Sequence, residues 1–199
     1  MEINARPIQK RSQETREKLL RAALSMYTEK GYHSTTVDDI AAAAGASTGI
    51  AYRYFRNKKD ILLSAISYAA ENIESIANIS DFFFPEDTSD IRAYFEAVLK
   101  AFEDIHVRFR DIHEELEGLQ HTDEDVRRLY NSITHEKMEK FTAKLGPLLD
   151  SKENIREKAY LAVNIMEQYC HLQMNSELKE LDIDVMREKT LDAVLCVLN

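Results

Sequence analysis

The sequence predicts an all-α protein, and three observations support that prediction. Apolar residues recur at spacings of three and four along most of the chain, which is the period of an amphipathic helix. No segment keeps the strict alternation of a half-buried strand. The 199 residues include only five Gly and three Pro, which leaves few turns for a β fold. We therefore expect about nine helices, and a hydrophobic content of 44% is enough for them to bury a sizeable core.

The first helix is predicted from about Ser12 to Lys30. Residues 1–11 are polar and basic and contain Pro7, so we expect a flexible basic arm before this helix. Gly31 ends the helix because glycine readily adopts the left-handed conformation that follows a helix. The predicted buried stripe consists of Leu20, Ala23, Leu24 and Tyr27.

Residues 36–55 predict two short helices joined by a tight turn. Thr36 is a good N-cap for the first of them, Gly45 supplies the residue that leaves it in the left-handed conformation, and Ser47 caps the second. This is the pattern of a helix-turn-helix, a unit that inserts its second helix into the major groove of DNA. The residues expected to pack the two helices together are Val37, Ile40, Ala41, Ile50, Ala51, Tyr54 and Phe55.

Six further helices are predicted after the motif. Asn57 caps the fourth helix, which runs to about Ile76, and the segment containing Phe82–Phe84 and Pro85 breaks it. The other five are predicted from Asp87 or Thr88 to about Arg108, from about Asp111 to Leu119, from Thr122 to Leu145, from about Ser151 to Leu178, and from about Asp184 to Leu198.

The region around the motif resembles a known family. Residues 15–62, about a quarter of the chain, resemble the DNA-binding domain of the TetR/AcrR family of one-component bacterial repressors. Ile50 and Ala51 depart from the pattern, since Thr or Ser and a larger aliphatic residue are common at these positions. The landmarks that carry the resemblance are Gly31, Thr36, Ile40, Ala41, Ala44, Gly45, Tyr52, Phe55 and Lys58.

The resemblance implies two domains. A helix-turn-helix DNA-binding domain would occupy residues 12–60, with the motif at 36–55, and a regulatory ligand-binding and dimerisation domain would occupy residues 61–199. The charge distribution agrees with this division. Residues 1–62 carry 11 Lys or Arg and 7 Asp or Glu, a formal charge of +4, whereas the rest of the chain carries 15 and 28, a charge of −13. A basic module on an acidic body is typical of DNA binding, although both sets of charges could simply be solvated.

Residue chemistry and the resemblance together predict DNA contacts around the motif. Small residues at the start of the second helix let its backbone approach the bases. Tyr52 is expected to donate its hydroxyl to a phosphate, the alternative being a core tyrosine, and Arg53 could read a guanine edge, bind phosphate or remain solvated. Thr36 and Lys58 stand at helix N-termini, where phosphate is favoured. The predicted DNA-binding residues are Thr36, Ser47, Thr48, Gly49, Tyr52, Arg53 and Lys58.

The larger domain offers two further sets of candidate residues. An apolar ligand pocket is predicted to be lined by Phe84, Tyr94, Phe95, Phe102, His106, Phe109 and Met138, although each could equally be ordinary core. The resemblance implies that the last two helices pair with those of a second copy. The residues predicted at this dimer interface are Val163, Met166, Cys170, Met186, Thr190 and Val194.

Metal, redox and catalytic sites are not predicted. The scattered histidines lack the spacing of a zinc site, so we expect no metal. Cys170 and Cys196 lie in apolar helical contexts and are expected to be buried free thiols, ahead of a disulfide or a redox switch. No phosphate-binding glycine loop, nucleophile elbow or paired-carboxylate motif occurs, so we expect neither catalysis nor a cofactor. The residues weighed for a metal are His106, His113, His121, Asp104, Glu114 and Glu117.

These features predict a ligand-responsive transcriptional regulator, normally a repressor. It would bind a palindromic double-stranded DNA operator as a homodimer and be released by a small, largely apolar effector. Two alternatives remain: a nucleoid or cell-division factor of the same fold without an inducer, and an enzyme that carries a helix-turn-helix. Because the sequence has no apolar run of 18 or more residues and no signal-peptide pattern, we expect a cytoplasmic protein without a membrane segment.

Overall fold

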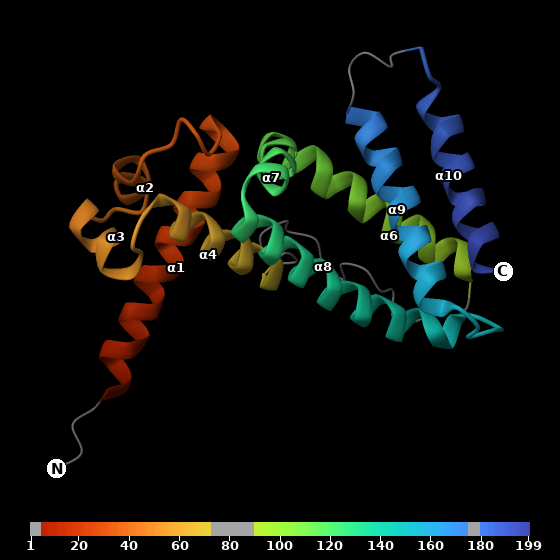
Figure 1. Cartoon of the computed structure of the whole chain (residues 1–199), viewed down its shortest axis with the longest axis horizontal. Coiled ribbons are helices and arrows are strands. Elements are labelled where there is room, and N and C mark those ends of the chain that lie inside the picture. Colours follow the sequence, from red (N-terminus) through yellow and green to blue (C-terminus); the bar gives the residue numbers. More distant parts are fainter. Residues whose placement is uncertain (1–4, 73–89, 175–179) are drawn as a thin grey trace. The chain divides into compact units, whose positions relative to one another are not determined.

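The computed structural model describes residues 5–72, 90–174 and 180–199 (Figure 1). Over these residues the chain is all-α, as predicted, with nine α-helices and one short 3-10 helix. None of the helices within the described ranges is both long and apolar enough to cross a membrane. The helices are α1 (Ala5–Lys30), α2 (Val37–Ala43), α3 (Thr48–Tyr54), α4 (Lys58–Glu71), α6 (Ile91–Arg108), α7 (Arg110–Thr122), α8 (Glu124–Leu145), η1 (Gly146–Leu148), α9 (Ile155–Met174) and α10 (Ile183–Leu198).

The chain divides into two compact units. The N-terminal unit comprises Met1–Ile73 and Asp111–Leu129, and the C-terminal unit comprises Glu74–Arg110 and Tyr130–Asn199. The N-terminal unit therefore includes all described residues of α4 and nearly all of α7, whereas the sequence predicted a boundary near residue 60. A helical period shows where a helix lies but not which neighbour it packs against, so α7 could not be assigned to this unit from sequence.

The core of the N-terminal unit forms where α1 packs against α2, α3 and α4. Three of the four residues predicted on the buried stripe of α1 are buried and Leu24 is only partly so, whereas Leu19, which was not predicted, is fully buried. The principal buried side chains are Leu19, Leu20, Ala23, Tyr27, Val37, Ile40, Ala41, Ala51, Phe55, Ile61, Leu62, Ala65 and Tyr68.

Helix α1 begins earlier than the sequence predicted. Its first residue is Ala5, so residues 5–11 are helical, which corrects the predicted flexible arm over residues 1–11. Pro7 does not prevent this, because a proline in the first turn of a helix lacks only an N–H group that has no intrahelical partner there. Residues 1–4 lie outside the described part of the chain.

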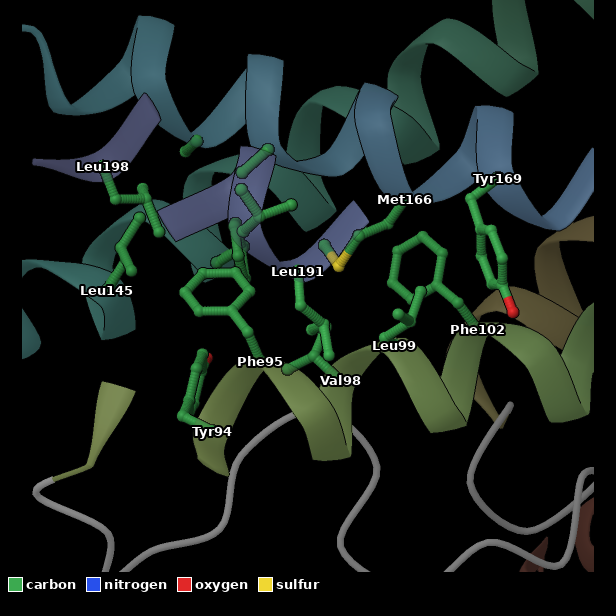
Figure 2. Close-up of a cluster of buried hydrophobic side chains, with 14 of the residues drawn as sticks. Tyr94, Phe95, Val98, Leu99, Phe102, Leu145, Met166, Tyr169, Leu191 and Leu198 are labelled. Atoms are coloured by element: carbon green, nitrogen blue, oxygen red, sulfur yellow. The ribbon is translucent and has the colours of Figure 1, made fainter. Parts of the chain in front are cut away.

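The C-terminal unit is built around α6, α9 and α10, with α9 packed against both of the others. Aromatic and aliphatic side chains from these helices and from α8 form one continuous core (Figure 2). Phe95 of α6 and Phe141 of α8 meet edge to face, with ring centroids 6.2 Å apart. The buried members of this core are Tyr94, Phe95, Val98, Leu99, Phe102, Met138, Phe141, Leu145, Ala159, Ala162, Met166, Tyr169, Cys170, Leu191, Val194 and Leu198.

Several helix starts differ from the sequence prediction by one to three residues. Asp90 caps α6, and its carboxylate accepts the backbone N–H groups of Arg92 and Ala93. Asp123 accepts the N–H groups at the start of α8, so it replaces Thr122, which ends α7. At α8, aspartate is a better N-cap than the predicted threonine. The predicted caps Asp87 and Thr88, the end of the fourth helix at Ile73 and Ile76, and Phe82–Phe84 lie outside the described residues.

Candidate nucleic-acid interface

The first helix of the motif begins with a reciprocal pair of hydrogen bonds. The Thr36 hydroxyl oxygen accepts the N–H of Asp39 at 3.1 Å, and an Asp39 carboxylate oxygen accepts the N–H of Thr36 at 2.9 Å. This capping box satisfies two N–H groups that the helix itself cannot pair. Hydrogen bonds from the Thr36 hydroxyl and N–H groups, with the Lys30 ammonium 3.3 Å away, lower the pKa of Asp39 to about 2. The cap predicted from Thr36 is confirmed.

Two turns, one before the motif and one within it, depend on glycine. Gly31 has φ +77° at the end of α1, and Gly45 has φ +67° between α2 and α3. Both are left-handed conformations that L-residues adopt only at a cost, so the conformations predicted for these glycines are confirmed. Gly31 is more constrained than Gly45, because a Cβ atom there would lie 3.2 Å from a carboxylate oxygen of Glu115, whereas nothing lies within 4 Å of the same atom at Gly45.

The second helix of the motif has one buried face and one face open to solvent. Ala51 and Phe55 are buried, whereas Tyr52 has 55% of its surface exposed and Arg53 is exposed beside it. The Tyr54 hydroxyl lies 3.2 Å from the hydroxyl of Ser12, which ties α3 to α1. The geometry therefore leaves Tyr52 and Arg53 outward, as a helix that contacts DNA requires, and it excludes the alternative that Tyr52 is a core residue.

The three residues predicted to contact DNA at the start of α3 differ in exposure and in hydrogen bonding. Ser47 occupies the N-cap position, as predicted, but its side chain makes no capping hydrogen bond. Its side chain and Gly49 are exposed. The Thr48 hydroxyl donates to the Asp38 carboxylate of α2, so it fixes the two helices of the motif to each other.

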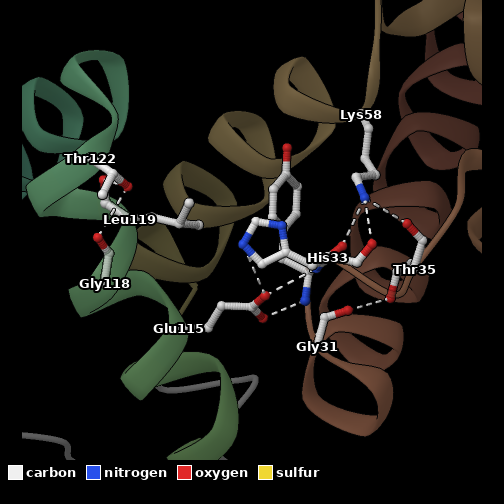
Figure 3. A network of polar contacts seen from close by, with 9 residues as sticks. Gly31, His33, Thr35, Lys58, Glu115, Gly118, Leu119 and Thr122 are labelled. Carbon is white, nitrogen blue, oxygen red and sulfur yellow. Dashed lines mark hydrogen bonds and ion pairs between the residues drawn. The ribbon is translucent and has the colours of Figure 1, made fainter.

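Lys58 is placed differently from the prediction. Its ammonium donates to the backbone carbonyl oxygens of Tyr32 at 2.9 Å, His33 at 3.1 Å and Thr35 at 2.9 Å (Figure 3). It also lies 4.5 Å from the centre of the Tyr32 ring. An ammonium group has three N–H donors, and all three are used here. Lys58 therefore fixes the turn before α2, and the prediction that it contacts phosphate conflicts with this arrangement.

Helix α7 contributes to the same turn through Glu115. The Glu115 carboxylate accepts the backbone N–H groups of Tyr32 and His33, the latter at 3.0 Å (Figure 3). Nearby, the Lys59 ammonium lies 2.7 Å from Asp123 and 2.6 Å from Asp125 and lowers the pKa of both carboxyls. Sequence reasoning missed Glu115, because its partners are more than 80 residues away and no local motif marks it.

The residues predicted to line a ligand pocket are mostly in the core of the C-terminal unit. His106 is also buried, Phe109 is partly buried, and Phe84 lies outside the described residues. The pocket stays a prediction. The four that belong to the core are Tyr94, Phe95, Phe102 and Met138.

The predicted dimer-interface residues face inward more than expected. Met166, Cys170 and Val194 are fully buried inside a single chain, and Thr190 is 7% exposed. Side chains in the core of one chain are not available to contact a second chain. The remaining two, Val163 and Met186, are partly buried at the edge of the core. The dimer stays a prediction, and any contact with a second chain would need residues that are more exposed than these.

Both cysteines are free thiols, as predicted, but only one is buried. Burial raises the pKa of the Cys170 thiol to about 12, so that thiol stays protonated at neutral pH. Cys196 is exposed, which corrects the prediction that both are buried. Of the histidines weighed for a metal, His106 belongs to the C-terminal unit, and His113 and His121 belong to the N-terminal unit.

The N-terminal unit thus contains a helix-turn-helix whose second helix presents a tyrosine and an arginine to solvent, which is the arrangement of a DNA-binding protein. Residues 19–65 match the family described as bacterial regulatory proteins, tetR family. The regulator AcrR of Shigella flexneri is 26% identical over 185 residues, which cover 93% of this chain and 75% of that protein. Two further regulators, HbdR of Aromatoleum sp. and AcuR of Cereibacter sphaeroides, are 37% identical over 62 residues and 50% identical over 50 residues. These two matches cover 27% and 23% of those proteins, so each concerns only a short part of either chain.

Solved structures share the fold along nearly the whole chain. Salmonella enterica GusR superposes with a TM-score of 0.71 at 17% identity, over 93% of this chain and 95% of that one. SCO4454, a TetR-family transcriptional regulator from Streptomyces coelicolor, gives 0.60 at 19% identity, over 94% and 95%. The chain belongs to the TetR/AcrR family of helix-turn-helix transcriptional regulators, a family of DNA-binding proteins and not of enzymes.

Proposed function

We propose that the protein is a homodimeric repressor that binds a palindromic operator and is released from it by a small, largely apolar effector. The observation that carries the proposal is the open face of α3, where Tyr52 and Arg53 project from a helix anchored by Ala51 and Phe55. The excess of positive charge in residues 1–62 favours the approach of DNA phosphates. The repressor would act in the cytoplasm.

The duplex needed for a test can be selected from a pool with two randomised, inversely repeated half-sites. Affinity for the selected duplex is then measured by fluorescence anisotropy at several salt concentrations. Because bound phosphates release counterions, affinity should fall steeply as salt rises. Tyr52→Phe removes only a hydroxyl and should weaken binding to all sequences alike, whereas Arg53→Ala should also lower the preference for the selected sequence if Arg53 reads a base.

Lys140→Ala is the matched control, because Lys140 is an exposed basic residue of α8 in the C-terminal unit whose partner is Glu136. It should bind like the wild type. If the pool yields no duplex bound above background, or if Tyr52→Phe and Arg53→Ala both bind like the control, the operator proposal fails.

Release by an effector is supported by the path of the chain between α6 and α7. Helix α6 places aromatic residues in the core of the C-terminal unit and ends at Arg108, with Phe109 as its C-cap. The next residue begins α7, whose Glu115 holds the turn before α2. A compound that displaces α6 would therefore displace α7 and, through Glu115, the motif. The coupling free energy between effector and operator equals the effector's preference for the displaced state, and in other systems it is about 1–3 kcal/mol. By reciprocity, bound operator must lower the affinity for the effector by the same factor.

The dimer is supported by apolar residues that stay exposed on the C-terminal helices. Leu161 of α9 is 55% exposed and Val185 of α10 is 53% exposed, and Leu181 just before α10 is 42% exposed. An obligate dimer interface of this kind typically buries more than ~2,000 Å² and is largely apolar. Pairing of α9 and α10 with the same helices of a second copy would cover these residues and present two copies of α3 to a palindromic site.

A further inference from the structure

Three potential metal ligands lie together in the C-terminal unit. His106 is near the end of α6, while Glu167 and His171 are four residues apart on α9 and so share one face of that helix. One ligand atom from each residue lies within 4.8 Å of the others. The packing of α6 against α9 therefore brings two imidazoles and one carboxylate to a single point.

The geometry around the Glu167 carboxylate fits a small cation. One carboxylate oxygen lies 2.9 Å from Nε2 of His106 and 3.9 Å from Nε2 of His171. Ligand atoms on a tetrahedral zinc ion are about 3.3 Å apart, given metal–ligand distances near 2.0–2.1 Å. The two measured distances lie on either side of this value, and the ligand atoms of His106 and His171 lie within 4.8 Å of each other, so the three residues are close enough to share one ion.

His106 is oriented as metal-binding histidines usually are. Its Nδ1 lies 2.8 Å from the carbonyl oxygen of Phe102. Since a carbonyl only accepts, Nδ1 must carry the hydrogen, and in the neutral ring Nε2 then has a lone pair. A backbone carbonyl that fixes the ring in this way is a recurrent second partner of metal ligands. The lone pair faces the Glu167 carboxylate, so two acceptors meet and a cation is required between them, either a proton or a metal ion.

The three ligands are distinct from the nearby charged groups, and two of them are accessible to solvent. Glu103 is occupied elsewhere, because it accepts the Tyr169 hydroxyl at 3.0 Å and the Arg187 guanidinium at 3.2 Å. Lys137 of α8 interacts electrostatically with Glu167, so an entering cation competes with its charge. The Glu167 side chain is 35% exposed and that of His171 is 29% exposed, which leaves a path from solvent.

We propose that His106, Glu167 and His171 bind a divalent first-row transition metal ion, with Zn²⁺ as the reference ion. Imidazole ligands suit Zn²⁺, Co²⁺, Ni²⁺ and Cu²⁺, whereas Mg²⁺ and Ca²⁺ require oxygen ligands. A tetrahedral ion held by these three residues takes one further ligand. Metal binding at this site can be tested without operator DNA, since the three ligands belong to α6 and α9.

The test uses the full chain without an affinity tag, in a Cys196→Ser background that removes the exposed thiol as a competing ligand. Apo protein is titrated with Co²⁺ while visible absorption is recorded, and Zn²⁺ binding is measured by calorimetry. One ion per chain should bind, Zn²⁺ should displace Co²⁺, and Mg²⁺ should have no effect. His171→Ala and Glu167→Gln should each weaken binding about 100-fold, since even the loss of a supporting partner of a ligand costs roughly 10–100-fold.

The control is His135→Ala, because His135 is an exposed histidine on α8 of the same unit. It should bind the metal like the parent protein. The variants at Glu167 and His171 are preferred to one at the buried His106, since both residues are partly exposed and the changes should leave the fold intact. If the parent binds no ion, or if both variants bind as tightly as His135→Ala, the cation between His106 and Glu167 is a proton and the metal site is rejected.

Discussion

Lys58 acts on the backbone of the turn that precedes α2. Three carbonyl oxygens of residues 32–35 converge on its ammonium, and Glu115 takes two N–H groups of the same turn. Hydrogen bonds to charged groups are worth about 1.5–3 kcal/mol each in mutational series, so this pair of side chains contributes to the position of the motif through the backbone of the turn.

Lys58→Met keeps the length of the side chain and removes the three donors. We expect the free energy of unfolding to fall by about 1–3 kcal/mol, because carbonyl groups in the turn lose their partner. Chemical denaturation with circular dichroism would measure it. Lys140→Met, on an exposed surface, is the control and should change stability little. An unchanged stability combined with a flatter salt dependence of operator binding would instead identify Lys58 as a phosphate contact.

Asp39 offers a pH-dependent test of the capping box. Its pKa is lowered to about 2, first by the Thr36 side chain. A lowered carboxyl pKa stabilises the fold above the unfolded value near 3.8, and this contribution is lost as pH falls towards 2. In an NMR titration, Thr36→Ala should raise the Asp39 pKa towards 3.8, while the pKa of Asp123, held low by Lys59, should not change. An Asp39 pKa that stays near 2 in the variant would show that Thr36 is not the cause.

The caps and turns of the motif region could be predicted from the sequence, because they depend on neighbouring residues. Thr36, Gly45 and Asn57 occupy the predicted cap and turn positions since each acts within three or four residues of itself. The assignment of α7 to the N-terminal unit and the meeting of His106 with Glu167 depend on residues far apart in the chain. No periodicity or local motif encodes such contacts, so sequence reasoning could not find them.

Gly31 and Gly45 allow a comparison between conformational strain and steric contact. Gly45→Ala should cost about 1–2 kcal/mol, the penalty of a left-handed L-residue, because its Cβ would meet open space. Gly31→Ala has the same penalty and also presses on the Glu115 carboxylate, so it should cost more. Denaturation of both variants gives the two values. In a Glu115→Ala background, the stability losses caused by Gly31→Ala and Gly45→Ala should become more alike. If Gly31→Ala still costs more, contact with Glu115 is not the reason.

At the scale of the whole molecule, the exposed fraction of each apolar side chain in the C-terminal unit distinguishes two groups. Buried side chains form the core of one chain, and exposed side chains could contact a second chain. Val194 has no exposed surface, whereas Leu161 and Val185 are more than half exposed. The sequence predicted apolar stripes on both helices but could not divide them between core and interface, because a helix in a bundle is apolar on both faces that it buries.

Leu161→Glu should therefore convert the dimer into a folded monomer. In a two-fold symmetric interface each substitution occurs twice, and burial of an unpaired charge costs about 3–5 kcal/mol, so association should weaken by at least about 100-fold. Sedimentation velocity at micromolar concentration measures the change, and circular dichroism checks that the helices remain. Val194→Glu should instead unfold the C-terminal unit, because the same charge enters the core of one chain. The monomeric variant should also lose tight operator binding, since two linked recognition helices bind the two half-sites of a palindrome more tightly than one helix binds a single half-site. If Leu161→Glu and a second variant, Val185→Glu, both sediment as the wild type does, α9 and α10 do not form the interface.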